Sequence, residues 1–319
     1  MTAGPAGPEP AGPRLVPCPF VRIVSLLPSA TEILFAVGAG DEVRGVTFEC
    51  DFPEEARLRT VVSTTELAPG LTPAEIDAEV RARLAAGEDL YTLDEGALRD
   101  LDPDLVVTQD LCAVCALDST DVDDALAHLG CRAEVLTLDP TTLEQVLESI
   151  GAVGRATGHE RAADELVASL RRRLARVADA VAGRPVPRVA VLEWTDPPFS
   201  SGHWVPDMVA AAGGRSVLGR SGTRSAPVRF EDVRAAAPDV VVVAPCGFGL
   251  EGARSQAEVL LDRGLLPDRP EVWAVDADAA VVRPGPRLVD GVEALAAMIH
   301  PGSAPLPRDL GALVRAAPC

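Results

Sequence analysis

The chain has 319 residues, a formal net charge of −19 and a composition that is 47% hydrophobic and 24% charged. Binding to nucleic acid or to an anionic membrane requires a basic surface, so this acidic balance argues against both partners. The length predicts two lobes, and the sequence contains no run of about 18 apolar residues that could span a membrane.

The first half of the chain alternates predicted strands with predicted helices. Residues 1–20, rich in Pro, Gly and Ala, predict a disordered tail. Strands are expected at 21–27, 43–48, 61–63, 104–108 and 133–138. Helices are expected at 28–37, 72–86, 98–101 and 122–129. This alternation is typical of βα units that build a mostly parallel sheet, so residues 21–140 are predicted to form an N-terminal α/β lobe.

The pattern changes between residues 141 and 183, where apolar residues recur at three- and four-residue steps without a strand signal. This periodicity predicts one long connecting helix, which would span roughly 60 Å if it were unbroken. Three glycines, Gly151, Gly154 and Gly158, weaken its middle.

The βα alternation resumes at residue 184. Strands are expected at 188–192, 239–244 and 272–275, and helices at 205–212, 230–237, 256–263 and 286–299. Residues 184–300 are therefore predicted to form a C-terminal α/β lobe, followed by a loose tail at 301–319 in which 310–314 could pack. The predicted fold class is α/β, with two lobes of mostly parallel sheet joined by one long backbone helix.

Polar and aromatic residues gather where the predicted strands end, and open parallel sheets bind their ligands at that edge. The positions singled out there are Glu49, Asp51, Asp110, Glu193, Trp194, His203, Trp204 and Phe248. His203 lies on a loop beside an aromatic residue. This position is equally typical of a histidine that contacts a ligand and of a solvated loop histidine.

The seven cysteines are an odd number and cannot all pair within one chain. Four of them also follow predicted strands, namely Cys50, Cys112, Cys115 and Cys246. Four thiolates would complete a tetrahedral zinc site or hold an iron–sulfur cluster. A single C-x-x-C pair is equally compatible with a redox role or with packing of small buried residues, so the metal site is a hypothesis.

Two further expectations concern chemistry and compartment. The chain carries no nucleophile elbow, phosphate-binding loop, zinc-protease motif or dinucleotide fingerprint, which predicts a protein that is not an enzyme. Residues 1–19 lack the basic and apolar regions of a signal peptide, which predicts a cytoplasmic location with reduced thiols.

Six segments carry a resemblance to a known family. They are RIVSLLPSATE at 22–32, GVTFECDFP at 45–53, LDPDLVV at 101–107, PPFSSG at 197–202 with the Gly213-Gly214 that follows, APDVVV at 237–242 and RPGPR at 283–287. These segments resemble the helical-backbone metal receptor superfamily, the class III solute-binding proteins of the iron/cobalamin periplasmic-binding type. The likeness is greatest to the cobalamin-binding branch and extends from Arg22 to His300.

The resemblance implies a corrinoid such as cobalamin, or a related planar metal complex, held in a cleft between two rigid lobes. Through the matching segments it adds Pro28, Phe199 and Arg283 to the expected cleft. It also implies that Glu32 is a surface acid that docks onto arginines of an ABC transporter.

The chain departs from this family in two respects. Members are usually exported, whereas a cytoplasmic protein would instead store its ligand or deliver it to an intracellular acceptor protein. The segment from Asp110 to Cys115 replaces the aromatic and glycine-containing loop of the cobalamin branch, so that its thiolates could ligate cobalt, iron or zinc.

Overall fold

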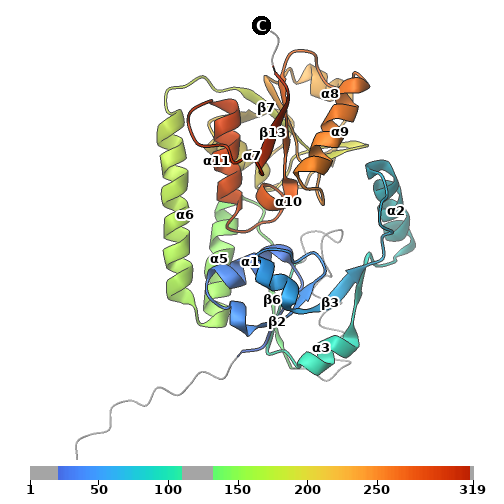
Figure 1. The fold of residues 1–319 in the computed structure, drawn as a ribbon, viewed down its shortest axis with the longest axis vertical. Helices are drawn as coiled ribbons and strands as arrows, with labels where there is room; N and C mark the ends of the chain where they lie inside the picture. The colour runs from blue at the N-terminus through green and yellow to red at the C-terminus, as the bar shows by residue number, and fades with distance from the viewer. Residues whose placement is uncertain (1–20, 110–131, 317–319) are drawn as a thin grey trace, which may run out of the picture.

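Two open sheets form the centres of two α/β lobes, and a pair of helices lies along one side of both (Figure 1). The computed structural model describes residues 21–109 and 132–316. The predicted helix at 122–129 and the predicted tail at 1–20 lie outside these ranges. None of the helices in the described ranges is long and apolar enough to cross a membrane.

The sheet of the N-terminal lobe has the order β4-β3-β2-β1-β5-β6. Its strands are β1 (Ile23–Ser25), β2 (Val43–Thr47), β3 (Thr60–Thr65), β4 (Tyr91–Leu93), β5 (Leu105–Thr108) and β6 (Glu134–Thr137). All neighbours are parallel except β3 and β4. The helices of this lobe are α1 (Pro28–Ala36), α2 (Pro73–Ala86) and α3 (Glu95–Leu101), with short 3-10 turns at Gly40–Glu42 and Glu54–Leu58.

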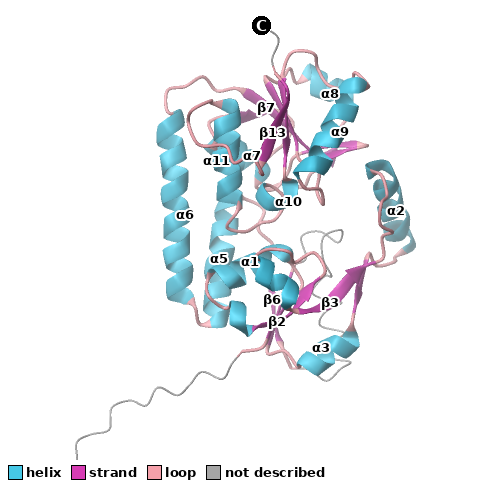
Figure 2. Ribbon diagram, in the orientation of Figure 1, coloured by secondary structure: helices cyan, strands magenta, loops and turns pink. Residues whose placement is uncertain are grey.

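The sheet of the C-terminal lobe has the order β10-β8-β7-β11-β12-β13, and β9 also pairs with β7. Its strands are β7 (Arg188–Thr195), β8 (Pro198–Ser200), β9 (Arg215–Ser216), β10 (Ala226–Pro227), β11 (Val240–Val243), β12 (Glu271–Val275) and β13 (Gly311–Arg315). The central strands β7, β11 and β12 are parallel, whereas β8, β10 and β13 run antiparallel to their neighbours. Helices α7 (Val205–Ala211), α8 (Phe230–Ala235), α9 (Leu250–Asp262), α10 (Ala277–Ala280) and α11 (Leu288–Ile299) complete the lobe (Figure 2).

The end of the chain differs from the prediction of a loose tail at 301–319. Residues Gly311–Arg315 form β13, which lies antiparallel to β12 with Trp273 opposite Leu313. This strand covers an otherwise open edge of the sheet, and such edges are usually covered or shortened in folded proteins. The C-terminal lobe therefore extends to Arg315 and does not stop at residue 300.

The connection between the lobes also differs from the prediction of one long helix at 141–183. It consists of two helices, α5 (Leu143–Thr157) and α6 (Glu160–Val181), which lie side by side in Figure 1. Gly158 ends α5 in the left-handed conformation, with φ +72°, and the chain turns back into α6. The 22 residues of α6 extend over roughly 33 Å.

Helix α6 packs against the cores of both lobes, so it is the backbone helix that the resemblance implied. Ala163 and Leu170 belong to the hydrophobic core of the N-terminal lobe, and Val177 belongs to that of the C-terminal lobe. The two-lobed α/β fold with mostly parallel sheets is therefore confirmed, and α5 and α6 together make the link along the side of the molecule.

The close approach of α5 and α6 depends on Gly154. A Cβ at this position would lie 2.4 Å from the Cβ of Ala163, which cannot move aside. We therefore expect Gly154→Val to lower the free energy of unfolding by about 2 kcal/mol, as overpacking does. At Gly151 of the same helix a Cβ would meet only the mobile end of Arg155, at 3.3 Å. Gly151→Ala should leave the free energy of unfolding unchanged or raise it by up to about 1 kcal/mol. Urea unfolding that shows the same loss of stability for both variants would contradict this account.

Candidate functional site

The carboxyl ends of the parallel strands in the two sheets face each other where the lobes meet, and we call this region the interlobe boundary. Pro28 begins α1 after a two-residue link from β1, which places Glu32 in the second turn of that helix. Asp51 follows β2. From the C-terminal lobe, Arg283 and Arg287 lie between α10 and α11. These four charged side chains contact one another across the boundary.

The contacts form an interlobe ionic cluster of Glu32, Asp51, Arg283 and Arg287. Arg287 donates through Nε to Glu32 Oε2 at 2.9 Å and through Nη2 to Glu32 Oε1. Arg283 donates to Asp51 and lies 3.7 Å from the Glu32 carboxylate. The Arg287 guanidinium also lies over the ring of Phe52, 4.2 Å from its centroid, which adds a cation–π contact between the lobes.

The position of Glu32 contradicts the prediction that it is a surface acid for docking onto a transporter. Its side chain is only 2% exposed and both carboxylate oxygens accept hydrogen bonds from Arg287. Burial raises the pKa of Glu32, and the hydrogen bond from Arg287 opposes that rise. A carboxylate held in this way joins the two lobes of the same chain and is not available to a partner protein.

Glu49 lies at the edge of the ionic cluster. Burial raises the pKa of its carboxyl to about 7; the nearby Arg283 guanidinium works against that rise, while Asp278 and Asp51 add to it. Burial likewise raises the pKa of Asp278, whose Oδ1 accepts a hydrogen bond of 3.1 Å from the Gly247 backbone N–H. Of the predicted strand-end acids, Glu49 and Asp51 are thus brought together, and both lie beside Arg283.

Glu193, at the end of β7, holds the loop that follows β8. Its carboxylate accepts a hydrogen bond of 2.9 Å from the Gly202 backbone N–H and another from the Ser225 hydroxyl. Burial raises the pKa of Glu193 to about 7, although both hydrogen bonds favour the charged form. Its carboxylate therefore supports a loop, and the predicted direct contact with a ligand is not needed to explain its position.

That loop carries His203 in a left-handed backbone conformation, with φ +47°. The imidazole ring lies 5.5 Å from the ring of Trp204, and Nε2 is buried without a hydrogen-bond partner among the described residues. Burial lowers the pKa of His203, and the charge of Arg224 lowers it further, so the neutral ring is favoured. A neutral imidazole with an unpaired nitrogen is the form that binds a metal centre.

Trp204 does not belong to the site, contrary to the prediction. It is 5% exposed, lies in the hydrophobic core of the C-terminal lobe and donates from Nε1 to the Val281 carbonyl at 2.8 Å.

Trp194 and Phe248 do form an aromatic pair, with ring centroids 5.9 Å apart and an angle of 57° between the planes. Phe199 lies opposite Trp194 in the β7–β8 ladder and is half-buried. Trp194 Nε1 donates to the carbonyls of Pro73 in α2, at 3.3 Å, and of Asp196, at 3.2 Å. The pair therefore lies next to a helix of the other lobe.

The two cysteines within the described ranges do not support the metal-site hypothesis. Cys50 is 3% exposed, its Sγ lies 3.0 Å from Thr31 Oγ1, and burial raises its pKa to about 11, which disfavours the thiolate that binds metals. Cys246 is exposed. Across 21–109 and 132–316, no group of three or more His, Cys, Asp and Glu side chains is arranged to hold a metal ion. Asp110, Cys112 and Cys115 lie outside these ranges.

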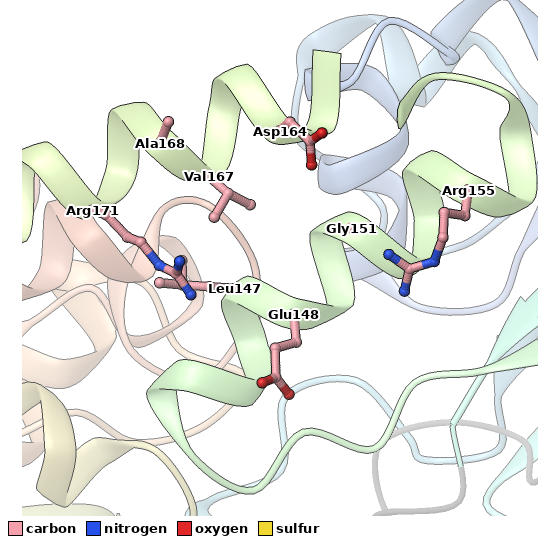
Figure 3. A pocket seen from close by; sticks show the side chains of 8 residues that line it. All are labelled: Leu147, Glu148, Gly151, Arg155, Asp164, Val167, Ala168 and Arg171. Carbon is pink, nitrogen blue, oxygen red and sulfur yellow. The ribbon is translucent and has the colours of Figure 1, made fainter. Parts of the chain in front are cut away.

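A separate groove, of about 550 Å³, lies between α5 and α6 (Figure 3). Arg155 and Arg171 flank it together with Glu148 and Asp164, and Leu147 and Val167 supply its apolar part. Only these two helices line it, and no predicted site residue belongs to it.

The fold and the facing strand ends define a two-lobed binding protein. The profile of a family described as "Periplasmic binding protein" matches residues 23–266. The chain belongs to this family, and the prediction of a binding protein that is not an enzyme is confirmed.

Relatives of known name agree with this assignment. The ABC transporter substrate-binding lipoprotein YvrC of Bacillus subtilis is 27% identical over 290 residues, which cover 88% of this chain and 80% of YvrC. A cobalamin-binding protein of Halobacterium salinarum is 27% identical over 88% of this chain and 69% of its own length. A vitamin B12-binding protein of Yersinia pestis is 27% identical over 70% of this chain and 69% of its own length.

Solved structures show the same fold. A periplasmic heme binding protein of Pseudomonas aeruginosa superposes with a TM-score of 0.69 and 22% identity, covering 93% of this chain and 99% of the other. The periplasmic vitamin B12 binding protein BtuF of Vibrio cholerae superposes with a TM-score of 0.59 and 21% identity, covering 86% of this chain and 94% of the other.

The ionic cluster leads to a prediction about stability. Arg287→Met leaves the buried Glu32 carboxylate without its hydrogen-bonded partner, and we expect a loss of about 3 kcal/mol in the free energy of unfolding. Arg57 is the matched control, because it is 61% exposed and lies 3.7 Å from Asp51. Arg57→Met should change stability by less than about 0.5 kcal/mol. Equal effects of the two substitutions in urea unfolding at pH 7 would show that the cluster does not hold the lobes.

The raised pKa of Glu49 leads to a pH-dependent prediction. The carboxyl has a pKa of about 7 in the folded protein and an ordinary value of 4.5, so its ionisation opposes folding. This cost is absent below about pH 4.5 and is complete above about pH 7. We expect Glu49→Gln to stabilise the protein by about 1–2 kcal/mol at pH 8 and to have little effect at pH 4.

The measurement for Glu49 is urea unfolding of wild type and variant at both pH values. Glu55→Gln, at an exposed position two residues before Arg57, serves as control and should behave as wild type at both. A stabilisation by Glu49→Gln that is the same at pH 4 and pH 8 would contradict the assignment.

Proposed function

We propose that this protein is a solute-binding protein that holds a corrinoid or haem, with cobalamin as the first candidate, between its two lobes. The observation that carries the proposal is the pair of aromatic side chains, Trp194 and Phe248, that lies next to a helix of the other lobe. Trp194 and Phe248 offer aromatic surface, and His203 has a buried nitrogen without a partner among the described residues. Planar macrocycles bind to aromatic surface, and imidazole is a common axial ligand of their metals.

The names of relatives and of proteins with the same fold support this ligand class. Proteins named for cobalamin or vitamin B12 binding align with most of this chain, and solved structures of the same fold carry names for vitamin B12 or heme binding. A backbone helix that packs on both lobes leaves the lobes little freedom to separate. A large, rigid ligand suits such a frame, because it does not need extensive closure around it.

The proposed partner is an ABC transporter that receives the ligand, as the name of the Bacillus relative suggests. Because Glu32 is buried, docking would use other acids of this strongly acidic chain. The predicted cytoplasmic location, with an intracellular acceptor in place of the transporter, stays a prediction, since the residues from which it was drawn lie outside the described ranges.

The test is a titration of the full chain with cyanocobalamin, dicyanocobinamide and haemin, followed by visible spectra and thermal unfolding. A ligand at 100 times its Kd should stabilise the protein by about 2.7 kcal/mol, because it binds the folded state only. Absence of any spectral or thermal change with all three compounds would refute the proposal.

A variant locates the site within this experiment. We expect Phe248→Ala to weaken binding about tenfold, the loss of one aromatic contact. Trp273→Phe is the matched control, because Trp273 lies on β12 with its Nε1 bonded to Glu271, outside the aromatic pair. Equal affinities of Phe248→Ala and Trp273→Phe would place the ligand elsewhere.

A further inference from the structure

The segment between β3 and β4 joins two antiparallel strands, unlike the other connections of the N-terminal lobe that the structure describes, and we call residues 66–90 the α2 flap. Its two ends lie next to each other, because β3 and β4 are antiparallel with Thr65 opposite Tyr91. The Glu66 backbone N–H donates to the Leu90 carbonyl at 3.0 Å and closes the base of the flap. The flap is thus attached to the lobe at a single place, the edge of its sheet.

Helix α2 is held by local interactions and not by packing. Thr72 and Glu75 form a capping box, in which the Thr72 backbone N–H donates to Glu75 Oε2 at 2.8 Å, and Pro73 occupies the first turn. Arg83 and Glu79 add an ion pair of 2.8 Å one turn apart. None of the 14 residues of the helix is buried. Helices of this length are marginal in isolation, so these local signals explain why it forms at all.

Two glycines lie inside the flap on either side of α2, and Gly87 ends that helix as Gly158 ends α5. Gly70 and Gly87 stand on either side of α2 with φ of +82° and +71°, values that other residues rarely adopt. In the described part of the chain, apart from the glycine and its two neighbours in sequence, no atom lies within 4 Å of the place where a Cβ would stand at either position. Hinges of moving loops are a few terminal residues of this kind, where the backbone can change without a clash.

The flap extends to the other lobe. In Figure 1, α2 stands near α9 on the opposite side of the molecule from α6. Trp194 Nε1, in the C-terminal lobe, donates to the Pro73 carbonyl of α2 at 3.3 Å. On the face of α2 that carries Ile76 and Val80 the side chains are half-buried, whereas Ala74, Ala78 and Ala82 are exposed. One face of the helix is therefore turned toward the protein.

We propose that the α2 flap is a gate that opens and closes the side of the interlobe boundary opposite α6. We further propose that the hydrogen bond from Trp194 to the Pro73 carbonyl holds the flap closed, and we call this contact the catch. This inference rests on the proposed function. The α6 side is closed permanently by a helix packed on both cores, and the ionic cluster holds α1 against the segment before α11. Among the described residues, the side spanned by α2 is closed by one hydrogen bond of 3.3 Å and by half-buried side chains, so a ligand can pass there at less cost than on the α6 side.

The catch is tested without ligand by hydrogen exchange of the full chain. We expect the amides of α2 to exchange faster than those of α6, and Trp194→Phe, which lacks the N–H donor, to accelerate exchange in 66–90 at least about threefold. Trp273→Phe should leave exchange in the flap unchanged. Two results would overturn the proposal whatever the ligand. One is amide exchange in α2 that is as slow as in α6, and the other is an exchange rate in 66–90 that Trp194→Phe leaves unchanged.

The gate is tested with a flapless variant, in which residues 67–89 are replaced by Asn-Gly to give a two-residue hairpin between Glu66 and Leu90. This variant should fold with a thermal midpoint near that of wild type, because it removes no buried residue. Cyanocobalamin or haemin, whichever binds wild type, should dissociate about tenfold faster from it in stopped flow. Unchanged dissociation would refute the gate. A wild type that binds none of the three compounds of the titration would refute the proposed function, and the exchange result would then decide whether Trp194 holds the flap.

Discussion

The carboxylate of Glu32, enclosed by two arginines of the opposite lobe, sets how the two halves of this protein meet. Removing a carboxylate from water is costly unless hydrogen bonds and opposite charges replace the water, and here Arg287 and Arg283 do so. Two arginines separated by a Pro-Gly-Pro sequence can reach across only if the sheets keep their present relation. Among the described residues, this contact and the packing of α6 hold the boundary at two places, and the side spanned by α2 has no comparable contact.

The fold could be predicted largely because its strands are short β-branched runs that alternate with amphipathic helices. The exceptions have physical reasons. The apolar periodicity of α5 continues in that of α6, so the turn at Gly158 was visible only as a weakness within one pattern. Strands such as β8 and β13 depend on a neighbouring strand for their hydrogen bonds, and three to five residues carry no periodic signal of their own.

The sequence predicted which polar and aromatic residues follow the strands, but not which of them are buried. Residues at strand ends do meet at the boundary, yet the sequence does not say which of them are covered. Trp204 and Glu32 are both buried, one in a core and one in an ion pair. Arg287 and Phe52 were missed as site residues, although the symmetry of RPGPR, with arginine at both ends, was a signal that both ends make contacts.

The setting of Glu49 couples motion of the lobes to the acidity of the medium. Its carboxyl has a pKa of about 7 because water is excluded from it. Any separation of the lobes that admits water returns this group toward its ordinary acidity, so that near neutral pH it loses a proton as the boundary opens. Entry of water at Glu49 therefore becomes easier as the surroundings become more alkaline.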